Sequence, residues 1–236
     1  MRIRVVLSHP SHPGNIGAAA RAMKTMGFTE LALVEPRHFP DAEATALAAG
    51  AGDVLEAARV HRSLDAALAD CIVAAGFSAR RRDLSHPPQT LREAAPELAA
   101  IATSQGLVAL VFGNETSGLS NEELARCQRF VSIPANPAYS SLNLAAAVQV
   151  VCYELAVAGA SFDKPRSLPR DAATADDVSR LCDELERVAT GSGYLDPERP
   201  GRFMQRIRRL FARAALEREE VKVLRGFLGT IAKRKP

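Results

Sequence analysis

Residues 107–120 read Leu-Val-Ala-Leu-Val-Phe-Gly-Asn-Glu-Thr-Ser-Gly-Leu-Ser, which predicts a buried strand, a loop bounded by glycines and the start of a helix. The apolar run from Leu107 to Phe112 is typical of a strand covered on both faces. Ser120 and Glu123 have the spacing of a helix capping box. A buried strand that leads through a short loop into a helix is the repeating unit of parallel α/β sheets.

The same alternation runs through the first two thirds of the chain. Short apolar or β-branched runs predict strands at 3–7, 31–34, near 60, 71–75, 107–112 and 130–133. Between them, helices are predicted at 15–26, within 41–48, near 63–68, within 91–102, from 120 and at 142–158. This order predicts a mostly parallel sheet with helices on both faces, whose ligands bind beyond the carboxyl ends of the strands.

After residue 158 the pattern changes from alternating strands and helices to helices alone. The stretch 159–171, with Pro165 and Pro169, has no periodicity and predicts a linker. Helices are then expected at 176–189, 202–216 and 219–231. We therefore predict an α/β domain over 1–160, a linker over 161–172 and a small helical extension over 173–236.

Composition excludes several classes of protein. The 236 residues are 47% hydrophobic and 24% charged, as in ordinary soluble domains, and no run of about 18 apolar residues suggests a membrane span. The first expected strand begins at Ile3 with no secretory n-region, h-region or cleavage site before it, so we do not expect an exported protein. The four cysteines form no CxxC pair, so we expect buried thiols in a reducing cytoplasm. His9 and His12 lie between prolines without acidic neighbours, and no metal site is expected there.

Charge is unevenly distributed along the chain. The net charge is +3, but residues 1–162 carry 13 Lys/Arg against 15 Asp/Glu, whereas residues 163–236 carry 17 against 12. The last 38 residues, 199–236, carry 12 against 3. A basic tail on a nearly neutral domain suggests a polyanionic partner, although a solvated helix surface would look the same by charge alone.

The helix expected at 202–216 carries a row of arginines. The face expected to pack is an apolar stripe of Phe203, Ile207, Leu210 and Ala214. Each arginine of the row comes one residue before a member of this stripe. The row is therefore expected about 100° round the helix from that face. The row, which suits a phosphate backbone, consists of Arg202, Arg206, Arg209 and Arg213.

Three segments place polar residues or glycines where strands end. In the first, Asn15 is expected to cap a helix and Arg21 lies on it, beside glycines and alanines that leave a thin face for something bulky. In the second, Gly113 would let a ligand reach the main chain, and Glu115 has no structural explanation. In the third, residues 140–141 are expected to open a helix, and Asn143 needs a partner of its own.

These segments resemble the SpoU branch of the SPOUT superfamily of RNA ribose 2′-O-methyltransferases. The matching motifs are NxGxxAR at 15–21, FGNExxGLS at 112–120 and IPxNPxYSSLNLAxAVQ at 133–149. The phrase NPxYSSLNLA and the helical extension are most similar to the TrmJ subfamily of tRNA methyltransferases. The resemblance implies an α/β SPOUT fold with a deep trefoil knot, a homodimer and S-adenosylmethionine as cofactor. The implied substrate is the ribose of cytidine or uridine at position 32 of the tRNA anticodon loop.

The resemblance also assigns site residues by match. The catalytic set is Arg21, Asn15, Glu115, Ser141 and Asn143. The cofactor-binding set is Phe77, Ser78, Ala79, Gly113, Ile133, Ser140, Ser141 and Leu142. RNA contacts are expected from Arg80, Arg81 and Arg82, which follow a cofactor loop, and from Arg202, Arg206, Arg209 and Arg213 of the tail.

The implied reaction transfers a methyl group from a sulfonium to the ribose 2′-oxygen. An arginine keeps its proton in proteins and so makes a poor general base. We therefore expect Arg21 to hold a substrate phosphate and stabilise the developing alkoxide, while Ser141 or a phosphate oxygen relays the proton.

Three alternatives fit part of the sequence. Ribosomal RNA is an alternative substrate, because related SpoU enzymes share the motifs. A non-catalytic RNA-binding module would have no need of the full catalytic set. A nicotinamide-dependent dehydrogenase is disfavoured because Gly50 and Gly52 are followed by no third glycine and come after helix-like sequence.

Overall fold

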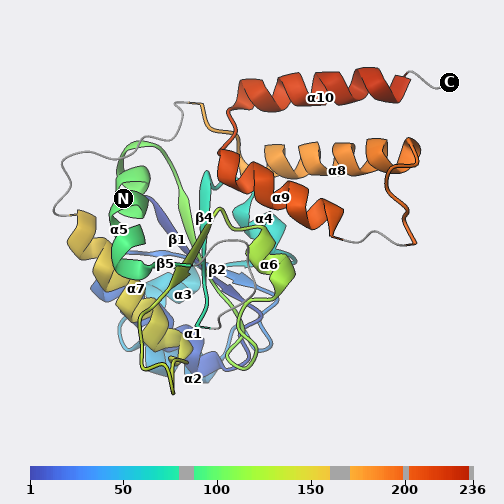
Figure 1. The fold of residues 1–236 in the computed structure, drawn as a ribbon. Coiled ribbons are helices and arrows are strands. Elements are labelled where there is room, and N and C mark those ends of the chain that lie inside the picture. Colours follow the sequence, from blue (N-terminus) through green and yellow to red (C-terminus); the bar gives the residue numbers. More distant parts are fainter. Residues whose placement is uncertain (80–87, 160–170, 199–201, 234–236) are drawn as a thin grey trace.

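The computed structural model describes residues 1–79, 88–159, 171–198 and 202–233. Seven strands form one sheet in the order β3-β2-β1-β6-β4-β7-β5 (Figure 1). Every pairing between these strands is parallel, as the alternating sequence predicts. Their bounds are β1 Ile3–Ser8, β2 Glu30–Val34, β3 Arg59–His61, β4 Val73–Phe77, β5 Gln89–Thr90, β6 Val108–Phe112 and β7 Arg129–Ser132.

Helices cover both faces of the sheet because side chains of the central strands alternate between two apolar clusters. In β1, Val5 and Leu7 face the larger cluster, whereas Val6 faces the smaller one. The helices on the larger cluster are α1 Pro13–Thr25, α2 Ala42–Ala48, α3 Gly52–Glu56, α5 Leu91–Ser104 and α7 Leu144–Gly159. The helices on the smaller cluster are α4 Leu64–Leu68 and α6 Asn121–Ala125.

Arg4 is a charged residue buried in the smaller layer, with 3% of its surface exposed. Its guanidinium forms ion pairs with Glu30 and Asp70, each at 2.5 Å, and donates a hydrogen bond to the carbonyl oxygen of Ala67 at 2.8 Å. These bonds connect β1, β2 and the end of α4. They stabilise a charge that would otherwise be too costly to bury.

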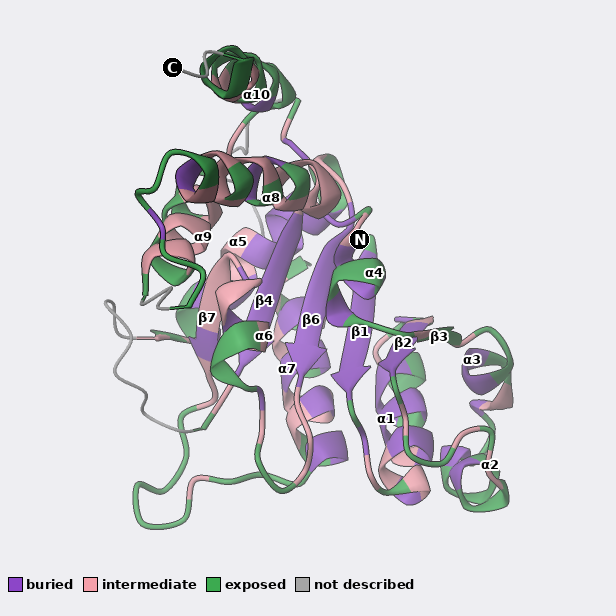
Figure 2. Ribbon diagram, turned by 90° about the vertical axis from the view of Figure 1, so that its right-hand side faces the viewer, coloured by how far each residue is buried: buried purple, intermediate pink, exposed green. Residues whose placement is uncertain are grey.

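Three helices form the C-terminal extension: α8 Ala175–Gly191, α9 Phe203–Ala214 and α10 Arg218–Lys233. They pack around a small apolar cluster that includes Leu181 and Val221. The extension lies against α4 and α6, at the end of the sheet where the strands begin (Figure 2). The amide of Ala175 donates to the carbonyl of Cys71 at 3.4 Å, and Ala175 packs against the smaller cluster.

The structure corrects several predicted elements. The strand expected at 71–75 is instead β4, Val73–Phe77, two residues later. Cys71 belongs to the preceding turn, where its amide donates a hydrogen bond to the carbonyl oxygen of Leu68. Two short elements have no signal in the sequence: α3, which has only five residues, and β5, which has two. The long helix begins at Leu144 rather than 142.

The apolar stripe predicted for the helix now defined as α9 is only partly packed, because Phe203 and Ile207 are half-buried but Leu210 and Ala214 are exposed. Leu210 is 48% exposed, and Phe211 packs against the apolar cluster of the extension instead. The packed side of this helix is one residue out of phase with the prediction, because contacts with α8 and α6 decide it. Measured from this observed packed side, the four arginines of the row lie opposite Phe211 on the helix, each within about 40°.

All four cysteines are buried and unpaired, as expected. Burial raises the pKa of Cys71, Cys127 and Cys152 to about 12. Among the described residues, no helix is long and apolar enough to cross a membrane. Within those same parts of the chain, no group of three or more His, Cys, Asp or Glu residues is arranged to hold a metal ion.

Candidate active site

The carboxyl ends of four central strands lie side by side and send their loops out from one edge of the sheet. Phe112 at the end of β6 is in register with Leu7 of β1 and with Phe77 of β4, and Phe77 is in register with Val131 of β7. The rings of Phe77 and Phe112 stack with centroids 4.8 Å apart and planes 9° apart. Because both rings are buried, a ligand at this edge would meet the main chain of Phe77 rather than its ring.

Glu115 accepts four hydrogen bonds from the segment that follows β1. Its Oε2 accepts from the amide and hydroxyl of Ser11, at 2.9 and 2.8 Å, and its Oε1 accepts from the amide of His12 at 3.1 Å and from Nδ2 of Asn15 at 3.0 Å. Burial alone would raise the pKa of Glu115, but the bonds from Asn15 and Ser11 outweigh it and hold the pKa at about 2. The carboxylate is therefore charged at neutral pH and, with both oxygens hydrogen-bonded, is a poor general base.

A chain of amide side chains continues from Glu115 to α7. Asn143 donates from Nδ2 to Oδ1 of Asn15 at 2.8 Å. Its own Oδ1 accepts from the amides of Ala145 at 2.9 Å and Ala146 at 3.3 Å, at the start of α7. These hydrogen bonds thus connect residues from all three sequence motifs, and Asn15 lies 100 positions before Glu115 and 128 positions before Asn143.

Two predictions about which residues cap helices are wrong, because the side chains of Asn15 and Asn143 have other roles in these hydrogen bonds. Asn15 does not cap α1, because the helix begins at Pro13 and Asn15 lies inside it, where its side chain is available for Glu115 and Asn143. Serines 140 and 141 do not open the long helix, because Asn143 takes that role. The expectation that Asn143 needs a partner is confirmed, and that partner is Asn15. Glu115, for which the sequence offers no structural role, holds the segment after β1 through its four hydrogen bonds.

At Gly17 and Gly113 the missing side chain makes room for other parts of the protein. A Cβ on Gly113 would lie 2.2 Å from the backbone of Gly118 and Leu119, so the loop after β6 closes back on itself at this point. A Cβ on Gly17 would lie 2.0 Å from the carbonyl oxygen of Ala44. The thin face of α1 is therefore filled by α2.

Arg21 and Ser141 are not part of the hydrogen-bonded chain. Both are exposed, and neither forms a hydrogen bond or ion pair with another residue that the structure describes. Their side chains are free to reach groups outside the protomer. The structure thus brings Asn15, Glu115 and Asn143 together and leaves the other two members of the catalytic set apart from them.

The residues expected to bind the cofactor lie on three loops at the same edge. Ser78 and Ala79 follow β4, Gly113 follows β6, and Ile133 follows β7. Leu142 is 40% exposed just before α7, and Ser140 is half-buried. Of the residues expected to contact RNA, Arg80, Arg81 and Arg82 lie outside the described residues. Arg202, at the start of α9, and Arg206 and Arg213 within it are exposed, and Arg209 is half-buried.

Sequence reasoning missed two serines of this region. Ser11 supplies two of the four bonds to Glu115, and its position between two His-Pro pairs has no helical or strand pattern. Ser8 is fully buried and donates to Oε1 of Glu123 at 2.5 Å, although the sequence assigns Glu123 only to the capping box with Ser120. That capping box is confirmed. Hydrogen bonds to side chains a hundred residues away leave no local pattern.

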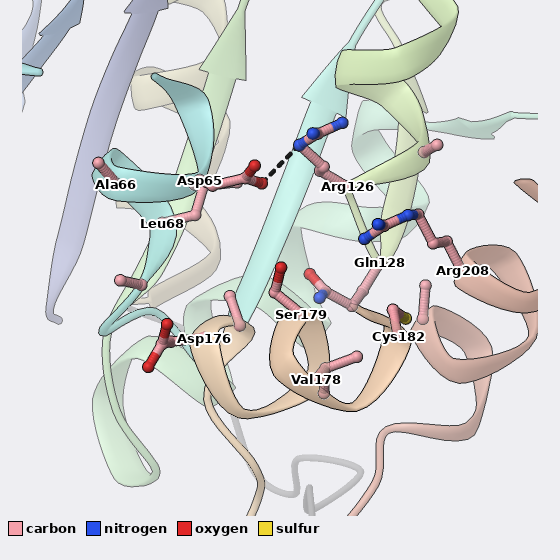
Figure 3. Close-up of a pocket in the computed structure, with 14 residues that line it drawn as sticks. Asp65, Ala66, Leu68, Arg126, Gln128, Asp176, Val178, Ser179, Cys182 and Arg208 are labelled. Atoms are coloured by element: carbon pink, nitrogen blue, oxygen red, sulfur yellow. Dashed lines mark hydrogen bonds and ion pairs between the residues drawn. The ribbon is translucent and has the colours of Figure 1, made fainter. Parts of the chain in front are cut away.

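A separate cavity lies where the extension meets α4 and α6 (Figure 3). It has a volume of about 180 Å³ and is lined mostly by small apolar side chains. Arg126 borders it and pairs with Asp65 at 2.5 Å, and Arg208 of α9 approaches from the other side and pairs with Asp183 at 3.3 Å. The charges at its rim are thus paired within the protein. Its lining comes from α4, α6, α8 and α9 and the residues beside them. Figure 2 shows α8 and α9 of the extension at the end of the sheet where the strands begin.

Comparison with known proteins gives the family. The SpoU rRNA Methylase family matches residues 2–153, and the C-terminal domain of tRNA methyltransferase TrmJ matches residues 176–236. The chain is 47% identical over 237 residues to the tRNA (cytidine/uridine/adenosine-2′-O-)-methyltransferase TrmJ of Pseudomonas aeruginosa, covering 96% of this chain and 92% of that protein.

Two solved structures extend the comparison. TrmJ from Z. mobilis is similar with a TM-score of 0.86 and 32% identity, over 98% of this chain and 100% of that one. The SpoU methyltransferase AviRb from Streptomyces viridochromogenes, solved in complex with the cofactor AdoMet, has a TM-score of 0.52 and 25% identity, over 66% of this chain and 60% of that one. The fold is thus the α/β fold of SPOUT methyltransferases, and the chain belongs to the SpoU methylase family, in its TrmJ branch.

Proposed function

We propose that this protein is an S-adenosylmethionine-dependent tRNA 2′-O-methyltransferase that modifies the ribose of cytidine or uridine at position 32 of the anticodon loop. The hydrogen-bonded chain from Glu115 through Asn15 to Asn143 carries the proposal, because it ties the three family motifs together at the carboxyl edge of the sheet. The similarity to TrmJ enzymes over nearly the whole chain supports tRNA rather than ribosomal RNA as substrate.

The loops at this edge fit the proposed cofactor. Exposed Leu142 and half-buried Ile133 offer apolar surface to an adenine ring, and the serines and main-chain groups of the same loops offer hydrogen bonds. When bound, S-adenosylmethionine supplies an activated methyl group on a sulfonium. The residues that would hold it are Phe77, Ser78, Ala79, Gly113, Ile133, Ser140, Ser141 and Leu142.

In the proposed reaction the ribose 2′-oxygen forms a bond to the methyl carbon, the carbon–sulfur bond breaks, and the hydroxyl proton must leave. Arg21, which keeps its charge, holds a neighbouring phosphate and stabilises the developing alkoxide. The hydroxyl of Ser141 relays the proton, accepting it while passing its own proton to solvent, or a phosphate oxygen of the RNA relays it to solvent. Glu115 takes no part in proton transfer, because its low pKa makes it a weak base and both of its oxygens already accept hydrogen bonds.

We also propose a homodimer whose active sites are completed across the interface. On α7, the outward side chains of Tyr153 and Val157 are 52% and 48% exposed, an apolar stripe of the kind that subunit interfaces cover. Arg21 lies on α1, which packs beside α7, and has no partner among the described residues. A second subunit on this stripe would bring Arg21 to the partner's motif loops.

Mixing two inactive variants tests the shared site. If Arg21 of one subunit serves the loops of the other, a dimer of one Arg21→Ala chain and one Ser141→Ala chain has one intact site and regains activity. If both residues serve the same subunit's site, every site in the mixture lacks one of them. In that case the mixture stays inactive.

The tail is proposed to hold the RNA. The arginine row of α9 lies opposite its packed side, and Arg202, Arg206 and Arg213 are exposed there, where a phosphate backbone can reach them. The domain limits proposed here are 1–160, 161–172 and 173–236, with a trefoil knot in the first domain. A reducing cytoplasm is the proposed compartment, in keeping with the buried, unpaired thiols.

The decisive experiment is mass spectrometry of nucleosides from tRNA incubated with the protein and S-adenosylmethionine. We expect 2′-O-methylcytidine and 2′-O-methyluridine, and their loss when position 32 of the transcript is a 2′-deoxynucleotide. Ribosomal RNA serves as the comparison substrate. Methylation of ribosomal RNA alone would replace the tRNA assignment, and no methylated ribose in either RNA would defeat the proposed activity.

A further inference from the structure

Helix α10 has two apolar faces, and the structure covers only one of them. Val221, Leu224 and Leu228 point into the apolar cluster of the extension. On the other side, Val223 and Phe227 are each 63% exposed and Ile231 is 39% exposed. These three residues, spaced four apart, form one line along the helix, which we call the outer stripe. Figure 1 shows α10 on the side of α8 that faces away from the sheet.

The outer stripe is symmetric about its central residue. Val223 lies four positions before Phe227, and Ile231 lies four positions after it. If two copies of α10 lie antiparallel with a twofold axis at Phe227, each Val223 meets the Ile231 of the other copy, and the two Phe227 rings meet each other. A self-complementary surface of this kind is what a twofold contact between identical chains requires.

The charges of α10 fit the same arrangement. Its first turn carries Glu219 and Glu220, and its last turn carries Lys233. An antiparallel pair therefore sets the acidic end of each helix beside the basic end of the other, whereas a parallel pair sets like charges together.

We propose that α10 is a contact surface for a second copy of this chain, through the outer stripe in an antiparallel pair centred on Phe227. The contact goes beyond the homodimer proposed through α7, since it uses a different helix at the other end of the molecule. Three side chains on each copy cover less area than the roughly 800 Å² per partner of a stable interface. The pairing is therefore weak by itself and depends on protein concentration.

Disulfide trapping tests the pairing directly, because the four natural cysteines are buried and burial raises their pKa values. A Phe227→Cys variant places one reactive thiol at the proposed twofold axis, where two Cβ atoms come within disulfide reach. The matched control is Lys222→Cys, on the same helix and 72% exposed in its side chain, but about 140° away from Phe227 round the helix. Under mild oxidation we expect covalent dimers from Phe227→Cys at least ten times faster than from Lys222→Cys.

A second measurement uses the uncrosslinked protein. Phe227→Lys should lower the average mass measured by light scattering at high protein concentration, and Lys222→Glu should not. Equal cross-linking rates for the two cysteine variants, or an unchanged mass for Phe227→Lys, would overturn the proposal. A third result would also overturn the proposal. If tRNA blocks oxidation of the Phe227→Cys variant and Phe227→Ala weakens tRNA binding more than tenfold, the outer stripe is a surface for RNA.

Discussion

Nδ2 of Asn143 lies 2.8 Å from Oδ1 of Asn15 and donates a hydrogen bond to it, so the first turn of α7 is tied to α1. Because Asn15 uses its other amide atom to donate to Glu115, it must have one donor and one acceptor in a fixed orientation. An asparagine meets that requirement, and an aspartate of the same shape does not.

Asn15→Asp should therefore damage the site. The new carboxylate would face the carboxylate of Glu115 at hydrogen-bond distance, and the repulsion would push the start of α1 away from the loop after β6 that carries Glu115. We expect S-adenosylmethionine affinity, measured by calorimetry, to fall by at least about tenfold, equal to roughly 1.4 kcal/mol. The control is Asn136→Asp: Asn136 is exposed and its Oδ1 only accepts from Ala138, so the change should leave affinity intact. Equal affinities for the two variants would contradict this role of Asn15.

The ionised state of Glu115 predicts a pH dependence of stability. Its pKa is about 2 in the folded protein, below the ordinary value, so the folded state binds this proton less readily than the unfolded state. The stabilisation is present above the ordinary pKa of about 4.5 and is lost as the pH falls toward 2. The free energy of unfolding of Glu115→Gln should therefore approach that of the wild type as the pH is lowered through this range. Exposed Glu122 supplies the control, since Glu122→Gln should run parallel to the wild type.

Arg4→Met should destabilise the fold without touching the site. The change removes a buried guanidinium and leaves Glu30, Asp70 and the carbonyl of Ala67 without a partner. Because both carboxylates are partly exposed and can hydrate, we expect a cost of about 2 kcal/mol in urea unfolding rather than that of a fully buried pair. Arg92→Met, which removes a surface ion pair with Glu154, should have a much smaller effect. Comparable losses for the two variants would show that burial of Arg4 adds nothing.

The arginine row of α9 should control the salt dependence of tRNA binding. Replacing Arg206 and Arg209 together by glutamine should weaken binding and reduce the slope of log affinity against log salt by about 0.7–0.9 for each phosphate that the variant no longer neutralises. Affinity for S-adenosylmethionine should stay the same. Arg187, on α8 with its side chain 76% exposed, provides a control substitution in the same extension. An unchanged slope in the double variant would remove α9 from the RNA surface.

Two glycines on helices predict opposite effects of alanine. At Gly17 an added Cβ would collide with the carbonyl oxygen of Ala44, so Gly17→Ala should cost roughly 1–3 kcal/mol as α1 and α2 separate. At Gly229 in α10 nothing lies within 4 Å of the added Cβ, so Gly229→Ala should stabilise by roughly 0.5–1 kcal/mol through helix propensity. Thermal unfolding followed by circular dichroism measures both. A stabilising Gly17→Ala would mean that the helices can separate without cost.

Local patterns in the sequence determined much of this protein. The alternation of apolar runs predicts the parallel sheet, and the Ser120–Glu123 capping box marks a helix start that the structure confirms. Both signals lie within a few residues, so they need no knowledge of the rest of the chain. The resemblance of the motifs to SpoU methyltransferases, and of the basic tail to the TrmJ extension, is visible in the sequence for the same reason.

The tertiary structure alone decided how those motifs work together. The partners of Glu115 lie about a hundred residues away in the chain, Gly17 is needed because α2 packs against it, and the packed side of α9 is fixed by Phe211 rather than Leu210. In each case the deciding interaction joins segments that are distant in sequence. Their proximity follows from the order of the strands, whereas sequence periodicity reports only on neighbours along the same helix or strand.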